Sequence, residues 1–172
     1  MLHHSYVINH NPLAINFTEL ETIDSYHMLM FLFADMDIMY STGFDKSDLS
    51  ELRKIVFKGQ KMARIGNWLS TWEREVDECD FSSGVFIYAV EQGVISESEV
   101  MEMIENPSQE LKEEVKKKIR ESNVEQGLCQ RWQYYHDMIN SKDYDVSSFD
   151  VTNFLEGMET FLKYHLASKG LK

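Results

Sequence analysis

The sequence predicts an all-α protein, a bundle of about six helices that follows an irregular N-terminal segment. Proline is the strongest breaker of helices, and the 172 residues contain only two prolines, Pro12 and Pro107. The glycines fall mostly near the ends of expected elements, and no strand-like alternation of apolar and polar residues continues beyond a few positions. We therefore expect an irregular segment over residues 1–16 and a single all-α domain over residues 17–172, large enough to form a core without disulfides.

The first expected helix runs from about Glu19 to Tyr40. Thr18 is its expected N-cap, and Gly43 marks its end. The stretch MLMFLFADMDIMY is densely apolar, so we expect this helix to lie centrally in the bundle.

Two further helices are expected before residue 93. One begins after Asp45 or Ser47, has Glu51 in a capping-box position, and continues to about Glu78. A short helix follows over residues 83–92.

The C-terminal half is expected to hold three helices. Ser96 and Glu99 form a capping box that opens a helix to about residue 106. Pro107 then starts a long helix to about residue 141, with a bend or break at residues 123–127 left open. The last helix runs over about residues 148–168 and stops at Gly170. The charge run LKEEVKKKIRE is typical of a solvated helix face with i, i+4 ion pairs.

Charge and composition exclude several classes of protein. Seventeen basic against 29 acidic residues give a net charge of −12, which disfavours binding to nucleic acid or anionic membranes. Cys79 and Cys129 have no metal-type spacing and indicate no disulfide framework. The N-terminus lacks the pattern of a signal peptide, and no apolar run reaches membrane-spanning length. We expect a cytoplasmic protein without membrane insertion.

Asn67, Thr71 and Glu75 form the most informative pattern in the sequence. Their spacing of i, i+4 and i+8 spreads the three side chains over only about 80° of one helix face. Mg²⁺ prefers oxygen ligands, usually takes only a few from protein, and leaves the others to water and substrate phosphates. The triad predicts a magnesium site that is weak alone and strong with a bound diphosphate. The alternative is that the spacing arose by chance on a solvated helix face.

The residues around the triad favour a polar lining backed by apolar packing. Small residues recur every three or four positions and would let another helix or a ligand approach closely; they are Gly59, Ala63, Gly66 and Ser70. The triad's face also carries Gln60, Arg64, Arg74 and Glu78, and the other side carries Met62, Ile65, Leu69, Trp72 and Val76.

The stretch from Asn67 to Glu75, NWLSTWERE, resembles the second metal-binding motif of class I terpene synthases. Trp68 departs from the motif, since the family commonly has Asp there. The following segment, SSGVFIYAVEQGVISESEVMEMI, is also similar to the family. The resemblance implies the fold of the C-terminal half of these enzymes, with Mg²⁺, or Mn²⁺ in its place, held by Asn67, Thr71 and Glu75. It further implies a prenyl diphosphate contacted by Arg74, with Arg64 on the same face as a second candidate.

The chain lacks the aspartate-rich first motif that these enzymes place opposite the second. Asp35 and Asp37 are two positions apart on a helix and point about 200° apart, so they cannot share a metal ion. Three hypotheses remain. In the first, the chain is one half or subunit of a diphosphate-releasing cyclase and pairs with a second copy or a complementary subunit. In the second, it is a non-catalytic helical interaction or regulatory domain derived from that fold. In the third, it is an unrelated acidic bundle. We assign no catalytic residue.

Overall fold

The computed structural model describes residues 2–169, and it describes side chains from residue 6 onward. The described residues are helical, without strands, as the sequence predicts. They form more helices than the six expected. In chain order the α-helices are α1 (Leu2–His10), α2 (Phe17–Asp24), α3 (Met30–Tyr40), α4 (Leu49–Asp77), α5 (Gly84–Glu91), α6 (Glu97–Glu105), α7 (Gln109–Glu121), α8 (Val124–Asn140) and α9 (Val151–Ala167).

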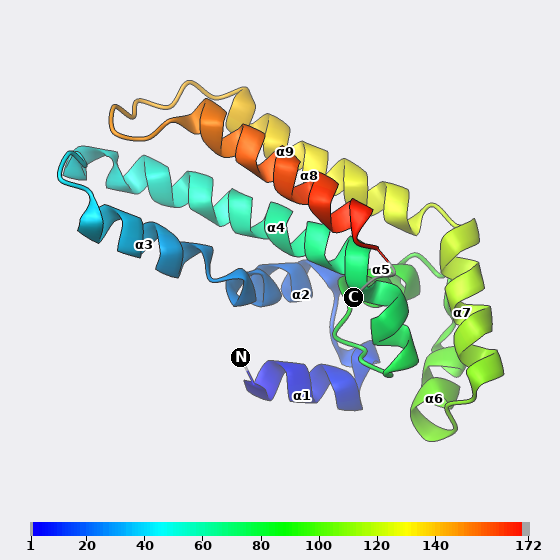
Figure 1. Cartoon of the computed structure of the whole chain (residues 1–172). Helices are drawn as coiled ribbons and strands as arrows, with labels where there is room; N and C mark the ends of the chain where they lie inside the picture. Colours follow the sequence, from blue (N-terminus) through cyan, green and yellow to red (C-terminus); the bar gives the residue numbers. More distant parts are fainter. Residues whose placement is uncertain (1, 170–172) are drawn as a thin grey trace.

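Helix α4 is the centre of the fold (Figure 1). It lies between α3 on one side and the pair α8 and α9 on the other, and α5 packs near its C-terminal end. The apolar side predicted for this helix is confirmed, because each of its five side chains is at most 2% exposed: Met62, Ile65, Leu69, Trp72 and Val76. Burial of large apolar side chains on one helix contributes on the order of 2 kcal/mol each.

The small residues of α4 form the contact with α9, as the sequence predicts. A Cβ atom added at Gly59 would lie 2.5 Å from Phe154, and one added at Gly66 would lie 3.5 Å from Leu162. A larger residue at Gly59 would therefore displace Phe154 of α9, whereas the distance at Gly66 is an ordinary van der Waals contact.

The expected irregular segment over residues 1–16 is wrong in part. Residues 2–10 form α1, and Pro12–Ala14 form a short 3-10 helix. Ile8 anchors α1 because its side chain is 1% exposed within the core. Asn9 adds a long-range bond, accepting a hydrogen bond from the backbone of Phe81 at 2.7 Å. The local sequence gives no helical periodicity here, so tertiary contacts decide the conformation.

The single helix expected over Glu19–Tyr40 is also wrong. Its N-cap is Asn16, not Thr18, since Asn16 Oδ1 accepts from the backbone of Glu19 at 2.9 Å. The helix is interrupted by a 3-10 turn over Ser25–Met28 and by Leu29, whose φ of 56° is left-handed. A left-handed Leu ends a helix at a cost of about 1–2 kcal/mol, and a run that is apolar on every side gives no signal for such a break.

The segment α3 lies at the surface, which corrects its expected central position. None of its residues is buried, although its sequence is the apolar stretch of the chain. Leu32, Phe33 and Met36 are each about half exposed, and Met39 is 82% exposed. An apolar helix without buried side chains leaves an open hydrophobic surface.

Capping signals predict the later helices well. Ser96 and Glu99 form the expected capping box of α6. The helix expected after Pro107 is capped by Ser108 and is split into α7 and α8. Ser122 causes the split, because its hydroxyl donates to the carbonyl of Ile119 at 2.7 Å and accepts from the backbone of Val124 at 3.2 Å. The expected stop of the last helix at Gly170 lies outside the described residues.

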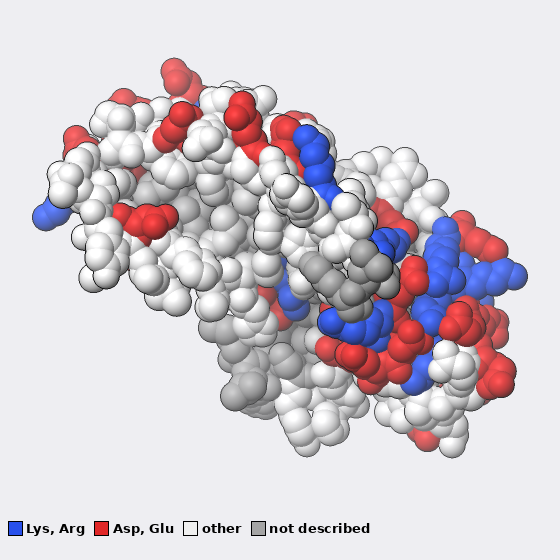
Figure 2. Space-filling view, in the orientation of Figure 1, with Lys and Arg blue, Asp and Glu red and all other residues white. Residues whose placement is uncertain are grey.

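The charged side chains gather at the opposite end of the molecule from α3 (Figure 2). Around α7, blue and red side chains alternate, whereas the face over α3 is largely uncharged. The predicted i, i+4 pairs of α7 are present, with Lys118 3.5 Å from Glu114 and Lys117 4.0 Å from Glu121. Two of its lysines also bind other helices, which the sequence did not predict: Lys118 binds Glu99 at 2.6 Å and Lys116 binds Asp77 at 2.7 Å. Among the described helices, none has the length and apolarity needed to cross a membrane.

Candidate metal and ligand site

Helix α4 places Asn67, Thr71 and Glu75 in one row, beside its buried apolar side. Thr71 is 4% exposed and Glu75 is 8% exposed, whereas Asn67 is half-buried. The structure brings two of the three side chains together, because Thr71 Oγ1 donates to Glu75 Oε1 at 2.6 Å. Thr71 Oγ1 also lies 2.9 Å from the backbone carbonyl of Asn67.

The side chain of Asn67 has a different partner. Its Oδ1 atom accepts a hydrogen bond from Arg64 Nη1 at 2.7 Å. Arg64 in turn forms a salt bridge with Asp24 of α2. Arg64 therefore connects the N-terminal end of the row to α2, and its charge is already compensated.

One oxygen of Glu75 lacks a hydrogen-bond partner in the part of the chain that the structure describes. Its Oε2 atom is buried and makes no hydrogen bond within the described residues. A buried acceptor without a partner costs about 1–3 kcal/mol, so a cation or a donor at this position would relieve a real deficit. The donor set of one amide, one hydroxyl and one carboxylate is chemically suited to Mg²⁺. Ligation by all three requires Asn67 Oδ1 to leave Arg64.

Burial raises the pKa of Glu75 above its usual range. The hydrogen bond from Thr71 and the nearby hydroxyl of Ser83 oppose this shift, as does the charge of Arg64, whereas Asp80 reinforces it. Ser83 Oγ lies close enough to affect the pKa, but neither it nor Glu75 Oε2 makes a well-formed hydrogen bond. The carboxyl group is thus less well compensated than its burial requires.

Arg74, the predicted diphosphate contact, lies on the exposed side of α4. Its guanidinium is 3.6 Å from Glu78, and both side chains are about half exposed. Such a pair is weak and exchanges readily, so Arg74 is free to turn toward a ligand.

An apolar groove runs along α4 between α3 and α9. It consists of two adjoining cavities of about 390 Å³ each, which share Met30, Phe33 and Phe154 in their walls. Ala63 lies at the floor of the second cavity, and Asn67 lies one helical turn further along α4. Asn67 lies about 40° around α4 from Ala63 and Glu75 about 120° around it, and neither residue lines the two cavities.

The two aspartates of α3 have different surroundings. Asp37 lines the groove. Asp35 is more than half exposed and lies 3.6 Å from Arg53.

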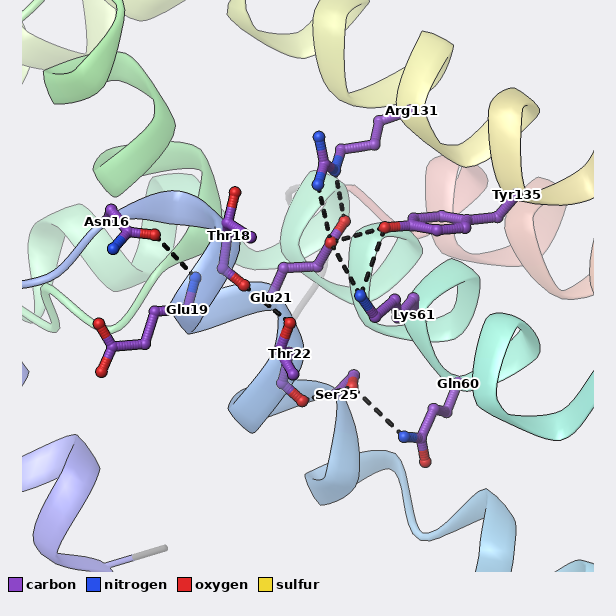
Figure 3. Close-up of polar contacts among 10 residues, drawn as sticks. All are labelled: Asn16, Thr18, Glu19, Glu21, Thr22, Ser25, Gln60, Lys61, Arg131 and Tyr135. Carbon is purple, nitrogen blue, oxygen red and sulfur yellow. Dashed lines mark hydrogen bonds and ion pairs between the residues drawn. The ribbon is translucent and has the colours of Figure 1, made fainter. Parts of the chain in front are cut away.

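Sequence reasoning missed a cluster of charged groups on the other side of α4 (Figure 3). Glu21 of α2 is 0% exposed and is bound by Lys61 of α4 and by Arg131 and Tyr135 of α8. The missed signal is Lys61, which falls on the apolar side of its helix close to the directions of Trp68 and Trp72. A charged residue in an apolar stripe is buried only when it has a partner.

Comparisons with known proteins give no relative for this chain, since no family model, curated protein or solved structure matches it. Within the described residues, no three His, Cys, Asp or Glu side chains come together as a metal cluster. Glu75 is the one member of the triad that belongs to these residue types.

Proposed function

We propose that the chain binds an isoprenoid diphosphate together with Mg²⁺, as one half of a terpene synthase-like cavity. The observation that carries this proposal is the Glu75 Oε2 atom, a buried oxygen without a hydrogen bond in the described residues, on the same helix that borders the apolar groove. A prenyl chain requires an apolar channel, and its diphosphate requires a divalent cation in a protein with a net charge of −12.

Different residues would contact the hydrocarbon chain and the diphosphate of the ligand. Met30, Phe33 and Phe154 would contact the hydrocarbon and keep water away from it. Asn67, Thr71 and Glu75 would hold the cation, and Arg74 would turn from Glu78 to the diphosphate. Arg64 would contact the diphosphate only if it released Asp24. Bound Mg²⁺ would supply neutralisation of the diphosphate charge.

The groove is open on one side, so the proposed function needs a second wall. A second copy of this chain or a complementary subunit with an aspartate-rich motif would supply it and exclude water from the ligand. Release of diphosphate is proposed only for that assembly.

Thermal unfolding with geranyl diphosphate tests the binding proposal. A ligand at about 100 times its Kd stabilises the folded state by about 2.7 kcal/mol, which corresponds to several degrees for a chain of this size. We expect this rise in Tm only when Mg²⁺ and geranyl diphosphate are both present. Mn²⁺ should replace Mg²⁺.

The matched variants are Glu75→Gln and Glu78→Gln. The first removes the carboxylate charge proposed to bind the cation. The second removes an exposed carboxylate at the C-cap of α4, which leaves Arg74 free for the diphosphate. The rise should be lost in Glu75→Gln and kept in Glu78→Gln. Equal stabilisation of both variants, or none of the parent protein, would refute the proposed function.

A second candidate function is a non-catalytic helical interaction domain. The observation that favours it is α3, an apolar helix of 11 residues without one buried side chain. A partner helix laid into the groove would cover this surface, as amphipathic helices do in other grooves.

Thermal melts and sedimentation equilibrium together distinguish the two candidates. Under the first proposal the parent chain shows the rise in Tm with Mg²⁺ and geranyl diphosphate, and Phe33→Glu and Met36→Glu on α3 abolish it. A chain that is only an interaction domain shows no such rise, and the same substitutions only reduce its self-association.

A further inference from the structure

The cluster around Glu21 contains more positive than negative charge. Arg131 donates to Glu21 from Nε, and from Nη2 at 2.9 Å, while Tyr135 Oη donates at 2.7 Å. Lys61 Nζ lies 3.3 Å from the same carboxylate. Two cations therefore surround one carboxylate, as Figure 3 shows, and one positive charge is left over.

Lys61 is the less satisfied of the two cations. Its side chain is only 11% exposed. Its two hydrogen bonds, to Glu21 and to Tyr135 Oη, are long at 3.3 and 3.4 Å. Removal of an ammonium group from water is costly unless close partners replace the water. A further anionic oxygen near Lys61 would supply such a partner.

This charge excess borders a cavity of about 680 Å³ between α2, α4 and α8. We call it the α2–α4–α8 pocket, and its polar lining includes Thr18, Glu21, Lys61, Gln130, Arg131 and Tyr135. Glu21, Lys61 and Arg131 are the charged residues in the described lining, so the pocket is positive in an acidic protein. The hydroxyl of Thr18 and the amide of Gln130 make no side-chain hydrogen bond within the described residues and remain available.

We propose that the α2–α4–α8 pocket binds a small polar molecule through one oxyanion, a carboxylate or a phosphate. Lys61 and Arg131 bind the oxyanion, and Gln130 and Thr18 contact the polar remainder of the ligand. Glu21 competes for the same cations and so limits the affinity. Since Lys61 lies about 160° around α4 from Ala63, this site is separate from the apolar groove and is independent of the proposed function.

Isothermal titration calorimetry with glycerol 3-phosphate and glycerate tests the proposal and separates the two oxyanions. These probes share a short polar body and have no apolar chain, and the titrations use the full chain at fixed ionic strength without Mg²⁺. We expect saturable binding of at least one probe, with inorganic phosphate weaker than glycerol 3-phosphate. Arg131→Gln should reduce the affinity about tenfold or more, because a charge-assisted pair is lost.

Two substitutions give effects that loss of structure alone would not produce. Glu21→Gln removes the internal competitor and should increase the affinity, although it destabilises the fold. Gln130→Glu adds a negative charge at an exposed position of α8 and should abolish binding while Tm is maintained. Arg120→Gln, a distant surface control bound to Glu73, should leave the affinity unchanged.

The proposal is overturned if neither probe binds saturably. It is also overturned if Gln130→Glu binds as tightly as the parent protein. A change in Glu75→Gln comparable to that in Arg131→Gln would place the binding at the triad instead.

Discussion

Glu21 of α2 and Glu75 of α4 are two buried carboxyl groups, but their environments shift their pKa values in opposite directions. Burial alone would raise the pKa of Glu21, yet hydrogen bonds from Arg131 and Tyr135 and the charge of Lys61 lower it below its usual range. For Glu75 burial prevails, and the pKa is raised. The difference lies in the number and charge of the partners rather than in exposure.

Glu21 is a structural carboxylate with several close partners, whereas Glu75 lacks part of the compensation that a buried carboxylate requires. Glu21 ties α2 to α4 and α8. Glu75 has one close side-chain donor, Thr71, and an oxygen without a hydrogen bond in the described residues. A cation would complete the environment of Glu75, whereas Glu21 already has more positive charge than it needs.

The largest effect is expected from Glu21→Gln. This change leaves Lys61 and Arg131 with no carboxylate in a buried cluster, and loss of one partner of a buried ion pair costs about 3–5 kcal/mol. Urea unfolding at pH 7 measures the free energy. Since the pKa of Glu21 is lowered in the folded state, its stabilisation exists above the unfolded value of 4.5 and is lost as pH falls through the folded pKa. The cost of the substitution should therefore shrink in acid, and a cost that stays constant down to pH 3 would contradict the assignment.

A smaller loss is expected from Tyr135→Phe. The change deletes one donor to Glu21 while both cations remain, and a hydrogen bond to a charged group contributes about 1.5–3 kcal/mol. The same urea series measures it. The matched control is Tyr134→Phe, whose side chain is 58% exposed and whose loss should be undetectable. If the two substitutions cost the same, the role given to the Tyr135 hydroxyl is wrong.

Glu75→Gln should have the opposite sign. Because the folded pKa of Glu75 is raised above 4.5, its favourable contribution is present in acid and is lost as pH rises through the folded pKa. The neutral glutamine keeps an acceptor for Thr71, so the variant should gain stability relative to the parent as pH rises from 4 to 7. Thermal melts across this range provide the measurement. A variant that is less stable at pH 7 would show that Glu75 is ionised and well compensated without a ligand.

The smallest effect is expected for Arg120→Ala, which removes an exposed pair. Arg120 Nη2 lies 2.6 Å from Glu73 Oε2, and the Arg120 side chain is 45% exposed. Solvent screening limits such pairs to less than about 1 kcal/mol. Urea unfolding should detect little change, and a loss as large as that of Glu21→Gln would mean that burial does not distinguish these interactions.

The sequence predicts the parts of the fold that local chemistry controls. Helix α4 follows from its apolar periodicity, and α6 follows from the capping box of Ser96 and Glu99. The break at Leu29 and the exposure of α3 depend on tertiary packing, which a uniformly apolar run does not encode. Helix α1 depends on the long-range contacts of Ile8 and Asn9, so the local sequence does not predict it.

The candidate site was predictable only in part. Helical spacing places Asn67, Thr71 and Glu75 in one row, but it cannot show that Thr71 donates to Glu75 while Asn67 bonds to Arg64. The Glu21 cluster unites residues separated by up to 114 positions, so no local pattern contains it. Lys61 on an apolar helix side was the one available signal.

The most direct test of the account is NMR of the chain with ¹³C-labelled glutamate carboxyl groups, titrated with Mg²⁺ and geranyl diphosphate. The Glu75 carboxyl resonance should shift when both are present, and the Glu21 resonance should not. A shift of neither resonance at saturating concentrations would contradict the claim that the unpaired oxygen of Glu75 receives the cation.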